Sequence, residues 1–184
     1  MIKEIDLKVR KKRAAWRADK ISNFIEHGSS VINIGAGDCF ISEFIAEKTN
    51  ARFANIDVVN TNLTNQKLII YGGGKIPFGN KEFDYALLLH VLHHALGNQE
   101  GIIKEAARVA NKIIIFEDKY QSLLDLFFLK ILHLYLNITQ KWKGKVKFRK
   151  PEEWKRFFED LGLEVEKIEF INFKISGIVF FILK

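Results

Sequence analysis

The amino-acid sequence predicts an α/β protein in which a doubly wound, mainly parallel sheet of seven strands carries helices on both faces and ends in a C-terminal antiparallel hairpin. Two observations predict this fold class. Short apolar runs typical of buried strands alternate with longer segments of helical periodicity, and such alternation favours a parallel sheet. The last two strand-like segments follow each other with no helix between them, which favours a hairpin.

The first half of the chain supplies four of these strands. Residues 8–26 carry apolar side chains at helical spacing among charged ones, so we expect an amphipathic helix closed by Gly28. Helical spacing returns at residues 40–48. The expected strands of this half are residues 31–34, 51–58, 67–71 and 83–89. The last of them is apolar almost throughout, as a strand covered on both faces should be.

The second half continues this alternation and then departs from it. We expect a helix at 98–110, a strand at 112–116 and a long apolar helix near 120–137. Pro151 suits the first turn of another helix, because proline lacks the backbone N–H that would be unpaired there. The closing strands are expected near residues 163–171 and 175–183.

Length and composition favour one domain over residues 1–184, with an N-terminal helix in 1–28 and a lid or insert in 119–161. The 184 residues lie close to the usual size of about 150 residues per domain, and 48% hydrophobic content can fill one core. Cys39 is the only cysteine, so no internal disulfide can form, and no signal-peptide pattern opens the chain. These features favour a reducing, cytoplasmic setting.

The net charge of +7 is concentrated in two short segments. Residues 1–20 hold eight Lys/Arg and three Asp/Glu, a net +5, and residues 141–150 hold six basic residues and no acid. The rest of the chain is therefore mildly acidic, at −4. Any partner with a negatively charged surface should contact these two segments.

A glycine turn is the most informative motif. The strand at 31–34 leads into Gly35–Gly37 and then into a helix, so the backbone can approach a ligand closely and the helix start can offer N–H donors. A dinucleotide fingerprint would need a third glycine where the chain has Phe40. Asp57, twenty residues past Gly37, ends the second strand and can accept hydrogen bonds from a ribose. An ordinary turn with a solvent-facing Asp57 is the alternative.

Further segments stand in a characteristic order after this turn. They are Lys75–Asp84, Leu87–His94 and Glu105–Val109. With the glycine turn and Asp57, they make residues 20–118 resemble the small class I S-adenosylmethionine-dependent methyltransferases, often grouped as methyltransferase type 11. The resemblance implies a Rossmann-like fold and S-adenosyl-L-methionine as cofactor.

The resemblance also implies where this cofactor binds. The glycine turn would pass under its methionine part, Asp57 would hold the ribose, and Gly72 and Gly73 would lie beside the adenine. Leu89 and His90 would face the amino-acid part and the methyl group. The cofactor-binding residues expected in this way are Asn33, Gly35, Ala36, Gly37, Asp57, Val58, Gly72, Gly73, Leu89 and His90.

Three positions depart from the family pattern. Asn33 stands where the family usually has Asp, Cys39 where it has glycine, and Gly72 near where an acidic residue binds the adenine amino group. Each lost charge-assisted hydrogen bond costs about 1.5–3 kcal/mol, so we expect weaker cofactor binding than is usual. Asp38 is the residue placed to compensate.

Histidines after the fourth strand are the candidates for acid–base chemistry. His90 and His93 are the candidate catalytic residues, because histidine titrates near neutral pH, although His93 and His94 suit a packing role better. His90 and His94 have the spacing of helical metal ligands, but the zinc motif HExxH needs Glu where the chain has Val91. We therefore expect no metal. Glu117 and Asp118 end the fifth strand and could meet a substrate or cap the next helix.

The last third bears on the methyl acceptor. A helix at 120–138 gathers its polar residues on one side, and its wide apolar face could pack on the sheet, cover an apolar substrate, or contact a membrane surface or second subunit. It is too polar to span a membrane. In the basic run 141–150, Trp142 and Phe148 could stack on bases.

The expected function is therefore methyl transfer from S-adenosylmethionine to a small apolar molecule. One alternative is an RNA methyltransferase that uses the basic segments 8–20 and 141–150. Another is a non-catalytic partner protein that keeps the methyltransferase fold, which the three departures favour.

Overall fold

The structure, a computed structural model, describes residues 2–140, 146–172 and 177–184. Its strands form one seven-stranded mixed sheet in the order β3-β2-β1-β4-β5-β7-β6. The strands are β1 (Ser30–Ile34), β2 (Arg52–Asp57), β3 (Leu68–Ile70), β4 (Phe83–Leu89), β5 (Ala110–Lys119), β6 (Val165–Asn172) and β7 (Gly177–Leu183). The helices are α1 (Ile2–Ser22), α2 (Phe40–Thr49), α3 (Gln99–Val109), α4 (Leu123–Gln140) and α5 (Pro151–Asp160), with a 3-10 turn at Leu92–His94. The predicted Rossmann-like α/β fold is confirmed, including its C-terminal antiparallel hairpin.

The chain divides into two compact units, which are described separately. The first comprises residues 1–87 and 108–111, and the second comprises residues 88–107 and 112–184. The parallel strands β1, β2 and β3 belong to the first unit. In the second, β7 pairs antiparallel with β5 on one side and with β6 on the other.

The first unit brings the carboxyl ends of its parallel strands to one edge. β1 pairs with β2 from Ser30↔Arg52 onward, and β2 pairs with β3 up to Asp57↔Ile70. The register explains why residues far apart in sequence meet there. The segments that leave this edge are the glycine turn after β1, the loop after Asp57 and the glycine loop after β3.

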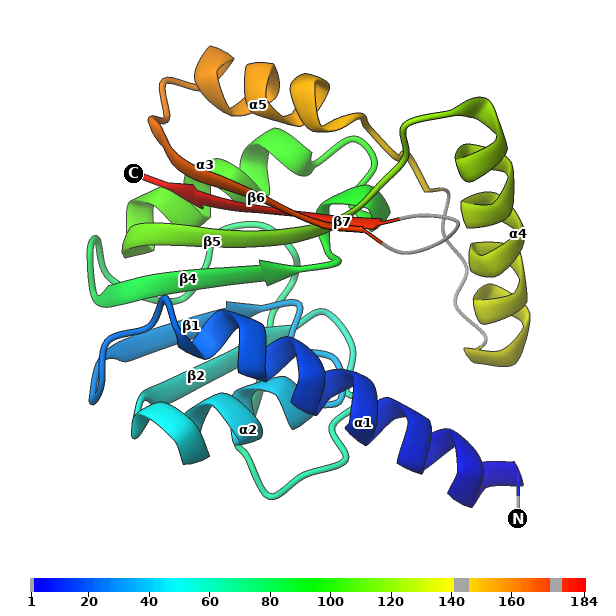
Figure 1. Ribbon diagram of the computed structural model, residues 1–184. Helices are drawn as coiled ribbons and strands as arrows, with labels where there is room; N and C mark the ends of the chain where they lie inside the picture. The colour runs from blue at the N-terminus through cyan, green and yellow to red at the C-terminus, as the bar shows by residue number, and fades with distance from the viewer. Residues whose placement is uncertain (1, 141–145, 173–176) are drawn as a thin grey trace. The chain divides into compact units, whose positions relative to one another are not determined.

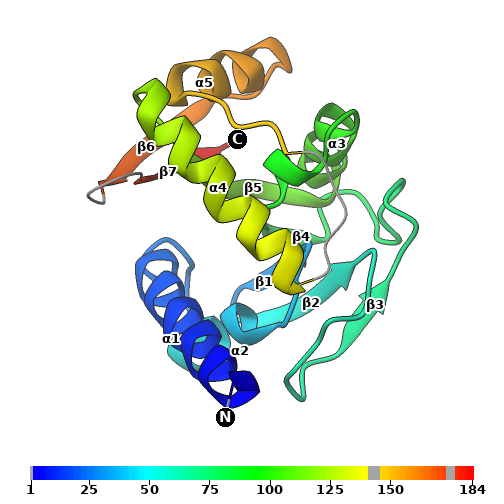
Figure 2. The same cartoon turned by 90° about the vertical axis from the view of Figure 1, so that its right-hand side faces the viewer.

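Helix α1 lies along α2 in the first unit (Figures 1 and 2). Ala14, Ala18 and Ile21 are buried on its inner side. The helix begins and ends earlier than the predicted residues 8–26, and Gly28 does not close it. The N–H of Gly28 donates to the carbonyl of Thr49 at 2.8 Å, so this glycine shapes the turn into β1 instead.

The second unit packs α5 on its hairpin through aromatic rings. Trp154 and Phe158 are buried and stacked at 5.7 Å between ring centroids, and Phe158 meets Phe181 of β7 edge-on at 5.1 Å. Pro151 is the first residue of α5, as predicted. Figure 1 shows α5 running beside the hairpin β6–β7.

Helix α4 turns much of its apolar surface outward. It begins beyond the end of β5 (Figure 1), and its described inward residues are Leu129 and His133. Its exposed apolar residues are Leu123, Leu124, Phe127, Phe128, Ile131 and Leu134. Among the described side chains of this helix, most of the apolar ones are therefore exposed. Within the described ranges, no helix is both long and apolar enough to cross a membrane.

The basic run 141–150 is described only from residue 146, so the prediction for Trp142 lies outside the described residues. The expectation for Phe148 is corrected, because its ring is buried and stacks on His93 at 5.4 Å between centroids. Arg149 donates to Gln99 and lies over the rings of Trp154 and Phe157. These two residues stabilise the second unit and are not available to stack on bases.

Candidate functional site

The glycine turn is held tightly against β2. Gly35 and Gly37 have positive φ angles of 74° and 57°, which a turn this sharp requires. The N–H groups of Gly35 and Ala36 both donate to the carbonyl of Ile56, at 2.9 and 3.1 Å. The turn therefore uses these two donors internally. Gly35 and Gly37 have no side chain, and Ala36 between them is nearly buried, so the turn leaves little side chain in the way of a ligand.

Asp57 completes this arrangement from the end of β2. Its carboxylate accepts the N–H of Gly37 at 2.8 Å, of Val58 at 2.7 Å and of Val59 at 3.2 Å. An ionised carboxylate can accept about four hydrogen bonds. The side chain thus keeps limited capacity for a ribose, and it ties the glycine turn to the loop beyond β2.

Asn33 lies in a buried polar network rather than on a surface. Its Nδ2 donates to Ser42 of α2 at 2.8 Å, and the Ser42 hydroxyl donates to Asn55 of β2. Within the described residues, the buried Oδ1 of Asn33 receives no hydrogen bond. The network joins β1, α2 and β2 beneath the glycine turn.

Asp38 and Cys39 lie between the glycine turn and α2 and shape the start of this helix. Cys39 precedes α2 with a φ of 64°, a left-handed conformation that favours glycine. Its side chain is fully buried, and burial, aided by the charges of Asp38 and Asp57, raises the pKa of the Cys39 thiol to about 11. Asp38 forms an ion pair with Arg10 of α1 at 3.1 Å and accepts the N–H of Phe40, so it stabilises the start of α2.

An apolar surface flanks Asp57 on the side expected to hold adenine. Val58 and Val59 follow Asp57 and are exposed, as is Ile70 in β3. Gly73 follows β3 with a φ of 76°, and a Cβ there would lie 3.3 Å from the Val58 side chain. Nothing lies within 4 Å of the corresponding position at Gly72. A glycine at 73 thus leaves the Val58 surface open.

A cluster of imidazoles and carboxylates forms in the second unit where β4 ends. Leu89 is buried, and His90 follows it with a φ of 59°, rare for a residue other than glycine. The Nδ1 of His90 faces Asp118 at 3.3 Å, and the Nε2 of His133 faces the same carboxylate oxygen at 3.4 Å. Burial would raise the pKa of Asp118, but the imidazoles of His90 and His133 outweigh it and hold this pKa well below its usual value.

His93 and Glu117 form the most buried part of this cluster. The Nδ1 of His93 donates to Glu117, and the same carboxylate accepts the N–H of Leu92 at 2.7 Å. Burial, followed by the charges of His93 and His133, lowers the pKa of His94 to about 3, so His94 is neutral at pH 7. The expected helical spacing of His90 and His94 is corrected, because the helix is a single 3-10 turn at Leu92–His94.

Sequence reasoning missed the partners that build this cluster. It found His90, His93 and His94 as neighbours and noted Glu117 and Asp118 at the end of a strand. It placed His133 among the polar residues of the long helix without linking it to either group. The available signal was a histidine in an apolar helix that follows two carboxylates by fifteen residues.

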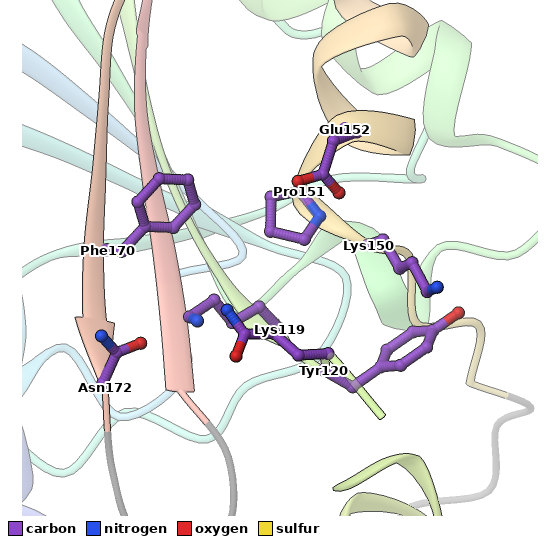
Figure 3. Close-up of a pocket in the computed structure, with 8 residues that line it drawn as sticks. Lys119, Tyr120, Lys150, Pro151, Glu152, Phe170 and Asn172 are labelled. Atoms are coloured by element: carbon purple, nitrogen blue, oxygen red, sulfur yellow. The ribbon is translucent and has the colours of Figure 1, made fainter. Parts of the chain in front are cut away.

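A pocket of about 390 Å³ lies elsewhere in the second unit. Figure 3 shows Phe170 and Asn172 of β6, the end of β5 and the start of α5 around it. The ammonium group of Lys119 is buried and lies 5.4 Å from the centre of the Phe170 ring. None of the residues expected from the sequence to bind cofactor or catalyse lines this pocket.

Comparisons with known proteins agree with the fold. Residues 32–113 match the family described as Methyltransferase domain. No curated protein sequence matches the chain significantly. A S-adenosylmethionine-dependent methyltransferase from Archaeoglobus fulgidus has a similar structure, with a TM-score of 0.74 and 15% identity over 95% of this chain and 94% of that one.

Two further solved structures carry more specific descriptions. A putative methyltransferase from Haloferax volcanii, solved in complex with the Trm112 methyltransferase activator, has a TM-score of 0.72 and 13% identity, covering 95% and 92% of the two chains. Magnesium protoporphyrin IX methyltransferase from Synechocystis PCC 6803, with bound SAH, has a TM-score of 0.67 and 14% identity, covering 95% and 82%. The shared architecture shows that the chain has the fold of the class I S-adenosylmethionine-dependent methyltransferases, and its residues 32–113 are similar to the family described as Methyltransferase domain.

Proposed function

We propose that this protein is a S-adenosylmethionine-dependent methyltransferase that acts on a small apolar molecule. The observation that carries the proposal is the edge formed by β1, β2 and β3, where the glycine turn, Asp57 and Gly73 follow three adjacent parallel strands. Open α/β sheets bind their ligands outside the carboxyl ends of the strands.

The residues at this edge fit the cofactor. Gly35 and Gly37 have no side chain and Ala36 is nearly buried, so a bulky ligand can lie against the turn. Gly73 leaves the exposed Val58 side chain open as an apolar surface for adenine, and Gly72 beside it adds no side chain. When bound, S-adenosylmethionine supplies a methyl group on a positively charged sulfur, already activated for displacement.

Asp57 is the residue we assign to the ribose. Its carboxylate already accepts three backbone N–H groups, so it is fixed in place before the cofactor arrives. Such pre-organisation reduces the entropy that binding must otherwise remove. Asn33 is buried and holds β1 against α2 through Ser42, so we assign it to support of the cofactor site rather than to contact with the cofactor.

His90 is the better of the two proposed bases. Its side chain is 14% exposed, whereas that of His93 is 1% exposed and bound to Glu117. Asp118 faces Nδ1 of His90 and so orients the ring that we propose as the base. Leu89 and His90 are also proposed to contact the amino-acid part of the cofactor. His93 we assign to support of the cluster.

The nature of the acceptor follows from α4. Its outward residues include Leu123, Phe127 and Leu134, an apolar surface that suits a hydrophobic molecule, a membrane surface or a second subunit. The RNA alternative is disfavoured, because Arg10, Phe148 and Arg149 are engaged within the protein. If the following test finds no cofactor binding, that result would favour the non-catalytic alternative.

Calorimetric titration with S-adenosylmethionine tests the proposal. We expect binding to the wild-type chain, and about 10- to 100-fold weaker binding to Asp57→Ala, because a hydrogen bond to a charged group contributes about 1.5–3 kcal/mol. The matched control is Asp19→Ala, which removes an exposed carboxylate of α1 paired only with Lys48.

Thermal unfolding of each variant checks that it folds. Absence of heat and of any thermal shift at millimolar cofactor would reject the proposed function. Equal affinity in Asp57→Ala and the wild type would remove Asp57 from the site.

A further inference from the structure

We propose that the second unit contains a transition-metal site, suited to Zn²⁺, whose ligands are His93, His94 and His133. This inference does not depend on methyl transfer, since none of these residues belongs to the edge formed by β1, β2 and β3. The sequence alone gave no reason to expect it, because two of the ligands are adjacent and the third lies on α4.

The histidines gather far more closely than chance placement would bring them. The chain has five histidines, and His27 is the one that lies outside the cluster. The potential ligand atoms of His93, His94 and His133 all lie within 4.8 Å of one another. Nitrogens on one tetrahedral Zn²⁺ lie about 3.3 Å apart, given Zn–N distances of about 2.0–2.1 Å. The separations must therefore shorten by at most about 1.5 Å for the three nitrogens to bind one ion.

Two carboxylates accept hydrogen bonds from proposed ligand rings, each at the nitrogen that would not bind the metal. Glu117 accepts the Nδ1–H of His93, so the lone pair of that ring lies on Nε2. Asp118 accepts the Nε2–H of His133, so the lone pair of this ring lies on Nδ1. Metal-bound histidines almost always donate their other N–H to a carboxylate, a carbonyl or water in this way. The cluster contains this arrangement twice.

The buried nitrogen of His133 supplies an independent observation. Its Nδ1 has no hydrogen-bond partner among the residues that the structure describes. A buried polar atom without a partner costs free energy, and coordination to a metal would remove that cost. The Nε2 of the same ring faces Asp118, so Nδ1 is the nitrogen of His133 that could bind a metal.

Burial and charge also suit a cation. Phe148 packs against the rings of both His93 and His133, which shields the cluster from water. Glu117 is fully buried, and a buried carboxylate needs a positive partner. A divalent ion on the far side of His93 supplies one.

The donor set selects the kind of metal. Three imidazoles suit Zn²⁺ and its neighbours in the first transition row, whereas Mg²⁺ and Ca²⁺ prefer oxygen ligands. Three protein ligands leave a fourth position for water or a substrate atom. A second set, His90, His93 and Asp118, shares His93 but draws on a carboxylate that two imidazoles already engage.

Metal titration of the wild-type chain, without an affinity tag and after dialysis against a chelator, is the first test. We expect one Zn²⁺ per chain by calorimetry. With Co²⁺ we expect the intense visible absorption of a four-coordinate site with nitrogen ligands. The absence of uptake of either ion would overturn the proposal, and this measurement needs no variant to fold.

Variants then test the ligand set. His133→Gln should abolish the Co²⁺ spectrum, and Asp118→Asn should weaken Zn²⁺ binding about 10- to 100-fold, as is usual for partners behind a ligand. His27→Ala is the matched control, since His27 is exposed in the first unit. Zn²⁺ should raise the unfolding temperature of the wild type and of His27→Ala, but not that of His133→Gln.

Two outcomes would contradict this assignment. Equal Zn²⁺ affinity in His133→Gln and the wild type would overturn it. Binding that survives His94→Gln but is lost in His90→Gln would point to the second set and overturn the proposed one.

Discussion

The two units satisfy the carboxylates at their strand ends in different ways. In the first unit, Asp57 accepts three N–H groups of the neighbouring backbone. In the second, Glu117 and Asp118 accept hydrogen bonds mainly from imidazole rings of other segments. Backbone partners come with the fold itself, whereas side-chain partners must each be supplied by the sequence. The second arrangement therefore depends on more individual residues and should be the more sensitive to substitution.

Removal of Glu117 should have the largest effect on stability. In the metal-free chain, Glu117→Ala should lower the free energy of unfolding by about 3–5 kcal/mol, because it leaves a buried imidazole without its partner. It also leaves the N–H of Leu92 without its acceptor. Urea denaturation in the presence of chelator measures the change.

The control is Glu166→Ala, which removes a carboxylate from the surface pair with Lys112 in the same unit. Surface pairs contribute about 0–1 kcal/mol. Similar losses in the two variants would mean that the buried cluster is no more critical than an ordinary surface ion pair.

An intermediate effect is expected at Arg108 in the first unit. Its guanidinium donates to the carbonyls of Phe78 and Ile76, both at 2.9 Å, and to Asn80 at 3.1 Å. Arg108→Ala should lower the free energy of unfolding by about 1.5–3 kcal/mol, as expected for hydrogen bonds to a charged group.

Proteolysis offers a second measurement for this variant, because the loop at residues 76–80 should become easier to cleave. Lys104→Ala on the same helix is the control, since Lys104 pairs only with Glu100 at the surface. If Arg108→Ala unfolds at the same urea concentration as Lys104→Ala, the loop is held by its apolar contacts instead.

The sequence predicted the first unit better than the second for a physical reason. The glycine turn, Asp57 and the strands between them follow from local patterns of alternation and spacing. The seven strands were placed within a few residues, although β5 is longer and β3 shorter than expected. Arg108 belonged to a recognised motif, but only the structure reveals that it clamps the loop before β4.

The second unit could not be assembled in this way, because its contacts join distant segments. His133 meets Asp118, and Phe148 meets His93, through packing that no local pattern encodes. The apolar face of α4 left the orientation of this helix open, because such a face can pack on the sheet, cover a substrate or contact a partner. In this helix His133 lies inward and Leu123 lies outward. Only knowledge of the carboxylates at the end of β5 explains that choice.

The smallest effect is expected at Cys39, where the strain lies in the backbone rather than in a side-chain partnership. Glycine relieves a left-handed conformation that costs other residues about 1–2 kcal/mol, but it also removes a buried side chain worth about 1 kcal/mol. Cys39→Gly should therefore change the free energy of unfolding by less than about 1 kcal/mol.

Cys39→Ala is the informative partner for this variant, because alanine loses the thiol and keeps the strain. Urea denaturation should thus find Cys39→Gly more stable than Cys39→Ala by about 1 kcal/mol, the reverse of the order expected inside a helix. If Cys39→Ala proves the more stable, the left-handed backbone conformation does not decide which residue is most stable at position 39. The family's preference for glycine there would then have to arise from space for the cofactor, which would move Cys39 from the scaffold of the first unit into its binding site.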